Sequence, residues 1–237
     1  MKVTKHKDLC DKIFTLWRNL IVKSWTIIDG RLQSSIPFPN SNMKKARERH
    51  MTREEVLTLL PEIKLIHSAD LQEKSIACWQ QVLELGGWDK KGVDKAPLAA
   101  GIVADGCPET GIDHCRRVVR MCQLAYDELG GWANEISKLD HDTLICGAVL
   151  HDIGKFLEYD IKDGKACHSE MGRYYNHVVS GAYIAKSNGL PDKIVHMILE
   201  HSDMQSPANT YDYPELMMMK KLDHMCFSIA WMAYPCK

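Results

Sequence analysis

The stretch that decides the fold of this chain is LICGAVLHDIGK, residues 144–155. A helix over residues 144–150 would be apolar on every side and must therefore lie inside the protein. His151 and Asp152 would end this buried helix, where an unpaired carboxylate costs on the order of several kcal/mol. A metal cation could pair with both side chains. We therefore interpret His151 and Asp152 as part of a metal site.

A second His-Asp pair, His141-Asp142, precedes the same apolar run. Asp140 and Asp142 stand just ahead of it, where an aspartate accepts hydrogen bonds from the free N–H groups of a first helical turn. We interpret this pair as a helix cap. The sequence thus predicts a helix that begins at one His-Asp pair and ends at the other.

Four more residues could join His151 and Asp152, and each lies on a segment with helical periodicity. They are His114 after the N-cap candidate Thr110, His177 in a helix from about Ser169 to Ser187, His201 at the end of a helix from Asp192 to Glu200, and Asp223 in a helix from Pro214. Asp223 falls inside an apolar stripe, where a charge needs a partner. An ion pair with a nearby Lys or His is the alternative for Asp223 alone, but the whole set favours a metal centre.

The order His, His-Asp, His, His, Asp, with Ile-Gly-Lys after the doublet, resembles the HD-domain superfamily of metal-dependent phosphohydrolases over about residues 105–230. The resemblance implies an all-α fold, an HD-domain-like helical bundle, and two divalent metal ions. It implies that Asp152 bridges the ions, that His114, His151 and Asp223 complete one site, and that His177 and His201 complete the other. Such ligands fit iron, manganese, zinc, cobalt or nickel.

The expected function is hydrolysis of a small phosphorylated substrate, a phosphomonoester or phosphodiester such as a nucleotide, by a metal-activated water. Asp152 and Lys155 are the expected catalytic residues. Lys155 would place an ammonium near the phosphate, although a solvated lysine at a helix end is the alternative. Ser202 follows His201 and no Gly-Tyr-Pro occurs, so the resemblance does not extend to the cyclic-dinucleotide phosphodiesterases with that signature.

Two other functions stay open. Inositol oxygenase is similar in all six ligands and in the Gly-Lys pair, yet it uses a diiron centre to oxidise its substrate with dioxygen. A protein that binds or senses a nucleotide without turnover is the third possibility. We favour hydrolysis because hydrolases are more numerous among HD-type proteins, an argument by analogy. A pocket that only binds has no need of six residues poised to activate water.

The composition is that of a globular enzyme, with 237 residues, 45% hydrophobic and 26% charged. A formal net charge of −1 predicts no bulk attraction to nucleic acid or to an anionic membrane. No run approaches the ~20 apolar residues that span a bilayer, and the charged first residues are unlike a signal peptide. Nine cysteines without Cys-x-x-Cys pairs fit reduced thiols in a cytoplasmic protein.

The chain is expected to contain an N-terminal helical region, residues 1–105, and an HD-like domain, residues 106–237. Periodicity predicts one helix over residues 8–29 and another from Leu71 to Leu85. Between them, the capping box at Thr52-Arg53-Glu54-Glu55 predicts the start of a third helix. Residues 30–42 and 88–106 are expected to be connectors. The N-terminal helices would form either a layer packed on the core or a lid and a surface for homo-oligomer contacts. No alternating strand pattern persists, which also favours an all-α fold.

Overall fold

The computed structural model describes residues 25–28, 31–34, 51–88, 92–202 and 212–236. Contacts divide the chain into two compact units, Met1–Arg47 and Glu48–Lys237. In the first unit, strand β1 (Trp25–Ile28) pairs antiparallel with strand β2 (Arg31–Ser34). The helix predicted over residues 8–29 is therefore wrong for 25–28, and the connector predicted over 30–42 contains a strand. Aromatic and β-branched residues in Trp-Thr-Ile-Ile favour a strand. The remaining parts of both predictions lie outside the described residues.

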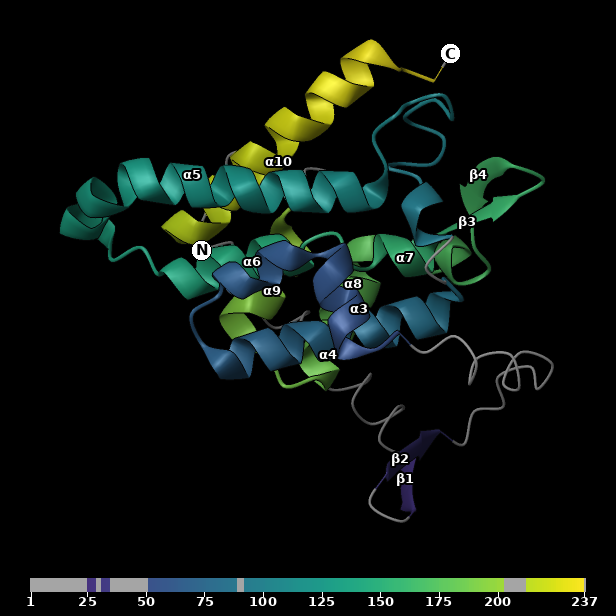
Figure 1. Cartoon of the computed structure of the whole chain (residues 1–237), viewed down its shortest axis with the longest axis horizontal. Helices are drawn as coiled ribbons and strands as arrows, with labels where there is room; N and C mark the ends of the chain where they lie inside the picture. Colours follow the sequence, from purple (N-terminus) through teal and green to yellow (C-terminus); the bar gives the residue numbers. More distant parts are fainter. Residues whose placement is uncertain (1–24, 29–30, 35–50, 89–91, 203–211, 237) are drawn as a thin grey trace, which may run out of the picture. The chain divides into compact units, whose positions relative to one another are not determined.

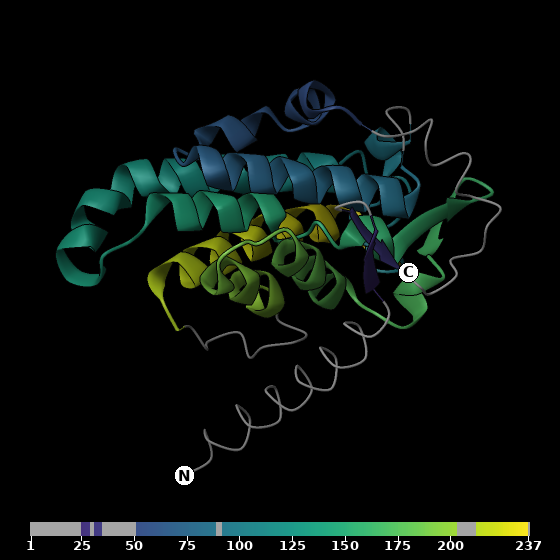
Figure 2. The same cartoon turned by 90° about the horizontal axis from the view of Figure 1, so that it is seen from below.

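The second unit is helical, and its elements follow the chain in a simple order. They are α3 (Arg53–Leu59), the 3-10 helix η2 (Pro61–Leu65), α4 (Ala69–Gly86), η3 (Val93–Lys95), α5 (Gly111–Ser137), α6 (His141–Leu150), α7 (Lys155–Glu158), β3 (Tyr159–Lys162), β4 (Lys165–His168), η4 (Met171–Arg173), α8 (His177–Ser187), α9 (Asp192–Glu200) and α10 (Pro214–Ala233). Helix α6 lies in the middle, and α4, α5, α9 and α10 pack around it (Figures 1 and 2). The predicted all-α helical bundle is confirmed, with small antiparallel hairpins as additions.

The buried position predicted for α6 is confirmed. Every side chain from Leu144 to Leu150 is buried, and the burial continues through His151 and Asp152. The helix therefore carries its two polar terminal residues into the interior. A hydrophobic run of this kind gains stability only when neighbouring helices cover all of its sides.

Helix ends follow the local signals in the sequence at most places. Thr52 and Thr110 form capping boxes with Glu55 and Asp113, and Gly87 ends α4 with a positive φ of 73°. The helix predicted from Ser169 is wrong in its first part, because α8 begins only at His177. Asn176 accepts a hydrogen bond from the amide of Val179 and so caps α8. The residues before Asn176 form the short helix η4 and a turn instead of continuing α8.

Residues 51–88 pack on the core rather than standing apart from it. Trp79 of α4 meets Phe156 of α7 edge-on, with ring centroids 5.0 Å apart, and its indole donates to the carbonyl of Val149. The indole of Trp88 donates to the carbonyl of Phe156. Helices α3 and α4 are thus a layer of the same compact unit. The limit of the HD-like domain at residues 105 and 106 stays a prediction.

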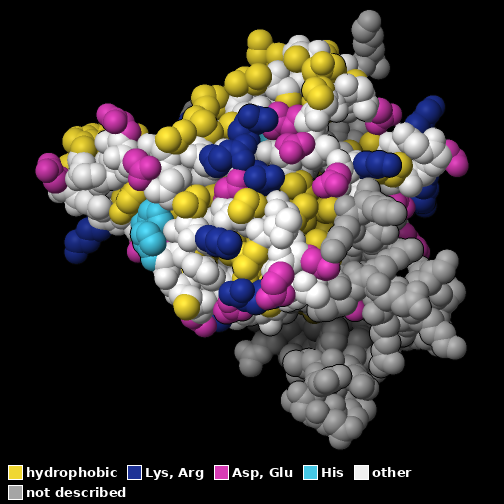
Figure 3. All heavy atoms as spheres, viewed as in Figure 1, with side chains coloured by type: hydrophobic (Ala, Val, Ile, Leu, Met, Phe, Trp, Pro, Cys, Tyr) yellow, Lys and Arg dark blue, Asp and Glu magenta, His cyan; other side chains and the backbone are white. Residues whose placement is uncertain are grey.

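The outer faces of α5 and α10 carry hydrophobic side chains that lie outside the core, and Figure 3 shows such side chains along the edge that α10 occupies. Trp132 and Ile136 of α5 and Ile229 and Met232 of α10 are all more than half exposed. The core is thus bounded by the inner faces of these two helices. None of the helices in the described ranges has both the length and the apolar character that crossing a membrane requires.

Candidate metal centre

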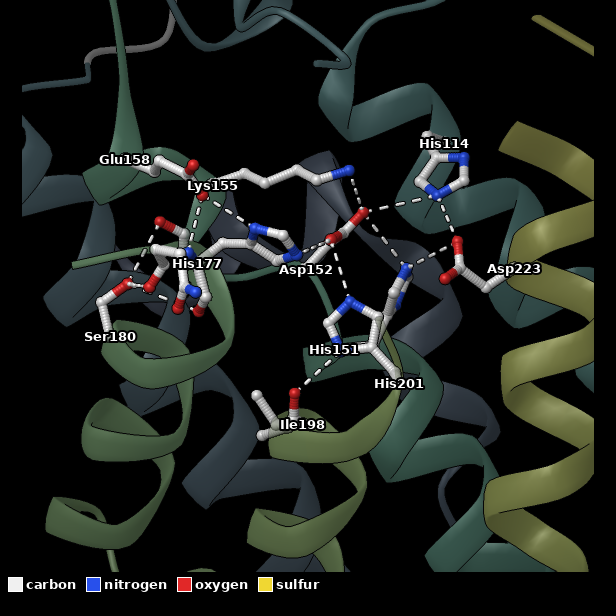
Figure 4. A network of polar contacts seen from close by, with 12 residues as sticks. His114, His151, Asp152, Lys155, Glu158, His177, Ser180, Ile198, His201 and Asp223 are labelled. Carbon is white, nitrogen blue, oxygen red and sulfur yellow. Dashed lines mark hydrogen bonds and ion pairs between the residues drawn. The ribbon is translucent and has the colours of Figure 1, made fainter. Parts of the chain in front are cut away.

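The six residues predicted as metal ligands lie together at the end of α6 (Figure 4). Each comes from a helix or from the residue next to one. His114 lies on α5, His151 and Asp152 follow α6, His177 begins α8, His201 follows α9, and Asp223 lies on α10. The fold therefore brings every one of them to one place. Their role as ligands stays a prediction.

Their donor atoms form two groups, and within each group all the atoms lie within 4.8 Å of one another. The first group is His114, His151, Asp152 and Asp223, and the second is Asp152, His177 and His201. Asp152 belongs to both. This division is the one that the family resemblance implies for a bridging Asp152.

The two oxygens of Asp152 face different groups. Its Oδ2 lies 3.4 Å from Nε2 of His114 and 3.3 Å from Nε2 of His151. Its Oδ1 lies 3.7 Å from Nε2 of His177 and 3.4 Å from Nε2 of His201. Two donors that share one ion at about 2.1 Å lie about 3.0 to 3.4 Å apart. Three of the four distances fit a carboxylate that would give one oxygen to each of two ions, and the distance to His177 is slightly longer than this range.

Three of the four histidine rings, those of His151, His177 and His201, have Nδ1 within hydrogen-bond distance of an acceptor away from the centre, whereas Nδ1 of His114 has no hydrogen-bond partner. Nδ1 lies 2.8 Å from the carbonyl oxygen of Ala148 in His151 and 2.8 Å from that of Ile198 in His201. In His177, Nδ1 lies 2.7 Å from Oε2 of Glu158. An Nδ1–H that donates to such an acceptor leaves the lone pair of Nε2 free for a metal ion. These three rings are thus held in the orientation that coordination requires.

Several polar atoms at the centre are buried without a hydrogen-bond partner. They include Nε2 of His151 and both carboxylate oxygens of Asp152, although Oδ2 also lies 2.7 Å from Nζ of Lys155. A buried polar group without a partner costs about 1–3 kcal/mol, and a charged one costs more. A cation between these atoms would satisfy them, so the residues fit a metal ion.

The charges of the centre support the same conclusion. Burial alone would raise the pKa of Asp152, but the charges of Lys155 and His151 hold it well below its ordinary value. Burial also opposes ionisation of Asp223, yet the hydrogen bond with His114 and the charge of His151 hold its pKa well below the ordinary value. Both carboxylates are therefore anionic at neutral pH.

The protonation of the two buried histidines differs. Burial lowers the pKa of His201 below its ordinary value. Burial also acts to lower the pKa of His151, but the nearby charges of Asp152 and Asp223 raise this pKa to about 10. A proton and a metal ion would compete for the same lone pair of His151.

A cavity of about 500 Å³ opens over the centre. Asp152 and Lys155 line it together with residues 99–102, Tyr159 and Phe227. An antiparallel bridge between Val103 and Pro235 joins the wall at residues 99–102 to the segment that follows α10. A cavity of this size suits a small molecule or part of a larger one.

Glu158 contributes to the centre and was not among the predicted residues. It is buried at the end of α7, and its Oε2 accepts from both the amide and Nδ1 of His177. Burial would raise the pKa of Glu158, but the hydrogen bond from His177 lowers it. An acidic residue so soon after a buried doublet is the signal that could have identified it. His168, which the sequence left outside the ligand set, lies on the cavity wall.

The first His-Asp pair does not cap α6, because the N-cap is Asp140, just before the pair. Oδ1 of Asp140 accepts from the amide of Thr143 at 2.7 Å. Asp142 instead accepts from the amides of His67 and Ser68, both at 2.8 Å, just before α4. The prediction that Asp142 caps its own helix is therefore wrong. It joins the start of α4 to the start of α6.

Comparison with known proteins adds a family. Residues 111–230, slightly more than half of the chain, match the model of the HD domain. A curated relative, Ribonuclease Y of Pseudothermotoga lettingae, is 33% identical over 97 residues, which are 41% of this chain and 15% of that protein. The chain thus spans only a small part of the length of this relative. No solved structure matches the chain. The residues of the family pattern also lie around one centre. This chain therefore belongs to the HD-domain family, in which metal-dependent phosphohydrolase activity is general.

Proposed function

We propose that this protein hydrolyses a phosphate ester bond of a small substrate with a water molecule activated by two divalent metal ions. The observation that carries the proposal is the shared carboxylate of Asp152, which gives one oxygen to each ligand group on the floor of the cavity. Two ions held there would lower the pKa of water and stabilise negative charge on phosphoryl oxygens.

Lys155 supplies the positive side chain at the same floor. Burial would lower its pKa, but the charge of Asp152 raises it above the ordinary value, so the ammonium keeps its proton. Its Nζ lies 5.9 Å from the centre of the Phe227 ring, which also lines the cavity. The ammonium can therefore donate hydrogen bonds to a phosphoryl oxygen at the place where charge develops.

The two-ion centre is tested by elemental analysis of the purified protein and of Asp152→Ala. We expect two ions per chain in the wild type and loss of both in the variant, because the variant removes a ligand of each group. Asp142→Ala is the matched control, since it alters the other His-Asp pair and should leave two ions. A wild type that turns over substrate without metal would contradict the proposal.

The reaction is tested by release of phosphate or of nucleotides under anaerobic conditions. The panel contains phosphomonoesters, phosphodiesters and a short RNA, which is included because the matched relative is named a ribonuclease. Metal-dependent hydrolysis of one class would support the proposal. Substrate-dependent uptake of oxygen would replace it with the oxygenase, and tight binding of a nucleotide without turnover would replace it with the sensing protein.

A further inference from the structure

His177 is anchored in a different way from its two neighbours at the centre. His151 and His201 each lie just after a helix, and each Nδ1 reaches the carbonyl three residues earlier in that helix. His177 is the first residue of α8, so its own helix offers no earlier carbonyl. Its ring depends on another element.

That element is α7, which ends at Glu158. Oε2 of Glu158 lies 2.6 Å from the backbone nitrogen of His177 and 2.7 Å from its Nδ1. The first amides of a helix have no partner within it, so one carboxylate oxygen fixes both the start of α8 and the ring. Figure 4 shows His177 between Glu158 and Asp152, with Nε2 directed to Asp152.

The two ligand groups are unequal. The first has four protein donors, whereas the second has three, one of which is the shared Asp152. Only His177 and His201 belong to the second group alone. Exposure does not separate the groups, since the side chain of His177 is 15% exposed and that of Asp223 in the first group is 14% exposed. The second group differs in having fewer donors.

We propose that Glu158 is a positioning residue that sets the affinity of the second group for its metal ion. The inference rests on the two-ion centre proposed above. A partner that holds a ligating histidine typically contributes 10- to 100-fold to metal affinity. Removal of Glu158 should thus weaken the ion between Asp152, His177 and His201 by about 10- to 100-fold. The ion of the first group should keep its affinity, because Glu158 contacts none of the residues that only this group uses.

The test is a Mn²⁺ titration of the metal-free full chain, followed by counting of bound ions and by electron paramagnetic resonance. Two neighbouring Mn²⁺ ions give a spin-coupled spectrum, and a single ion gives six lines. Glu158→Ala should bind one ion where the wild type binds two, and should show the six-line spectrum. Glu158→Gln should restore the second ion, because its amide oxygen can still accept from His177.

Asn176→Ala is the matched control, because Asn176 caps the same helix but bonds to the amide of Val179 and not to the ring. It should keep two coupled ions. If Glu158→Ala does not fold, Glu158→Asp replaces it, since its shorter side chain withdraws the carboxylate from His177 without removing the charge. The same loss of one ion is expected.

The outcomes separate this inference from the proposed function. A wild type with two ions and a Glu158→Ala variant with two ions of unchanged affinity would overturn the role of Glu158 and leave the two-ion centre standing. Loss of both ions in the variant would also overturn it, because the effect would not be selective. A wild type that binds fewer than two ions would refute the centre itself.

Discussion

Lys155 places a positive charge 2.7 Å from Asp152 at the floor of the cavity. We predict that Lys155→Met lowers kcat about 100-fold, the usual loss for one donor to a developing negative charge. The metal content should not change. Steady-state kinetics with metal analysis would test this. Lys165→Met, on the exposed part of β4, is the control and should keep full activity. Equal activity in both variants would show that Lys155 does not contact the phosphate.

Gly154 in the motif is required by close packing. Its φ is −68°, an ordinary helical value, so the backbone conformation does not require a glycine here. A Cβ added there would lie 2.0 Å from the carbonyl oxygen of His177 and 2.7 Å from the amide of Gly181. The start of α7 thus lies directly against α8.

Gly154→Ala should therefore destabilise the fold by about 1–3 kcal/mol, as overpacking usually does. Urea unfolding would measure the difference. Gly131→Ala is the matched control, since a Cβ at this position in α5 meets nothing within 4 Å. It should be neutral or stabilise by about 1 kcal/mol, because alanine favours a helix. A neutral Gly154→Ala would contradict the packing argument.

Between elements, Asp142 joins the start of α4 to the start of α6. Burial acts to raise its pKa, but hydrogen bonds from His67, His141 and Ser68 lower it below the ordinary 3.8. Because this pKa is lower in the folded state than in the unfolded chain, ionised Asp142 stabilises the fold at pH values above the ordinary pKa. That stability is lost as the pH falls through the folded-state value.

We predict that Asp142→Asn destabilises the protein by about 1 kcal/mol at pH 7, because one amide loses a charged acceptor. The difference from the wild type should disappear as the pH falls below about 3.8. Chemical unfolding across this range would test it. Asp127→Asn, on the exposed face of α5, should change the stability by less than about 0.5 kcal/mol at any pH. A difference that grows in acid would contradict the predicted sign.

Elements with strong local signals were predictable from the sequence. Thr110 marks the start of α5, and the helix Asp192–Glu200 has the predicted bounds because its apolar residues repeat with helical spacing. The hairpin of β3 and β4 was missed although its signals are in the sequence. Residues 159–162 alternate apolar and polar side chains, and Asp163-Gly164, both with positive φ, form the two-residue turn. The start of α8 depends on Glu158, a contact that no local pattern contains.

Over the whole molecule, the candidate centre joins segments from residue 114 to residue 223. The unfolded chain cannot hold these donors together, so metal ions should bind the folded state far more tightly. An ion at 100 times its Kd adds about 2.7 kcal/mol of stability. We predict a higher Tm with Mn²⁺ than with a chelator, measured by differential scanning calorimetry.

Asp152→Asn should lose most of this increase in Tm, and Asp142→Asn should keep it. The two variants make the same chemical change at the two His-Asp pairs. A wild-type Tm that does not respond to Mn²⁺ or to chelation would contradict metal binding at the centre.

The six residues were predictable because their order resembles the HD pattern and because each lies on a helical segment, with Asp152 and Asp223 as carboxylates in an apolar context. The cavity was not predictable from the sequence. Its wall at residues 99–102 has no periodic pattern and reaches the centre only through tertiary contacts. The partners of two rings, the carbonyl groups of Ala148 and Ile198, are backbone groups without a sequence signature.

The pairing between the cavity wall and the segment that follows α10 also has a consequence for the order of folding. The amide of Ala104 donates to the carbonyl of Tyr234, and the amide of Cys236 donates to that of Ile102. Contacts between segments so distant in the sequence are expected to form late, because earlier contacts must first offset the entropy cost of closing the loop between them. We therefore expect a nascent chain to assemble α4, α5 and α6 before it completes the cavity. Until α10 has docked, Asp223 and Phe227 are missing from the cavity, and the candidate centre is incomplete.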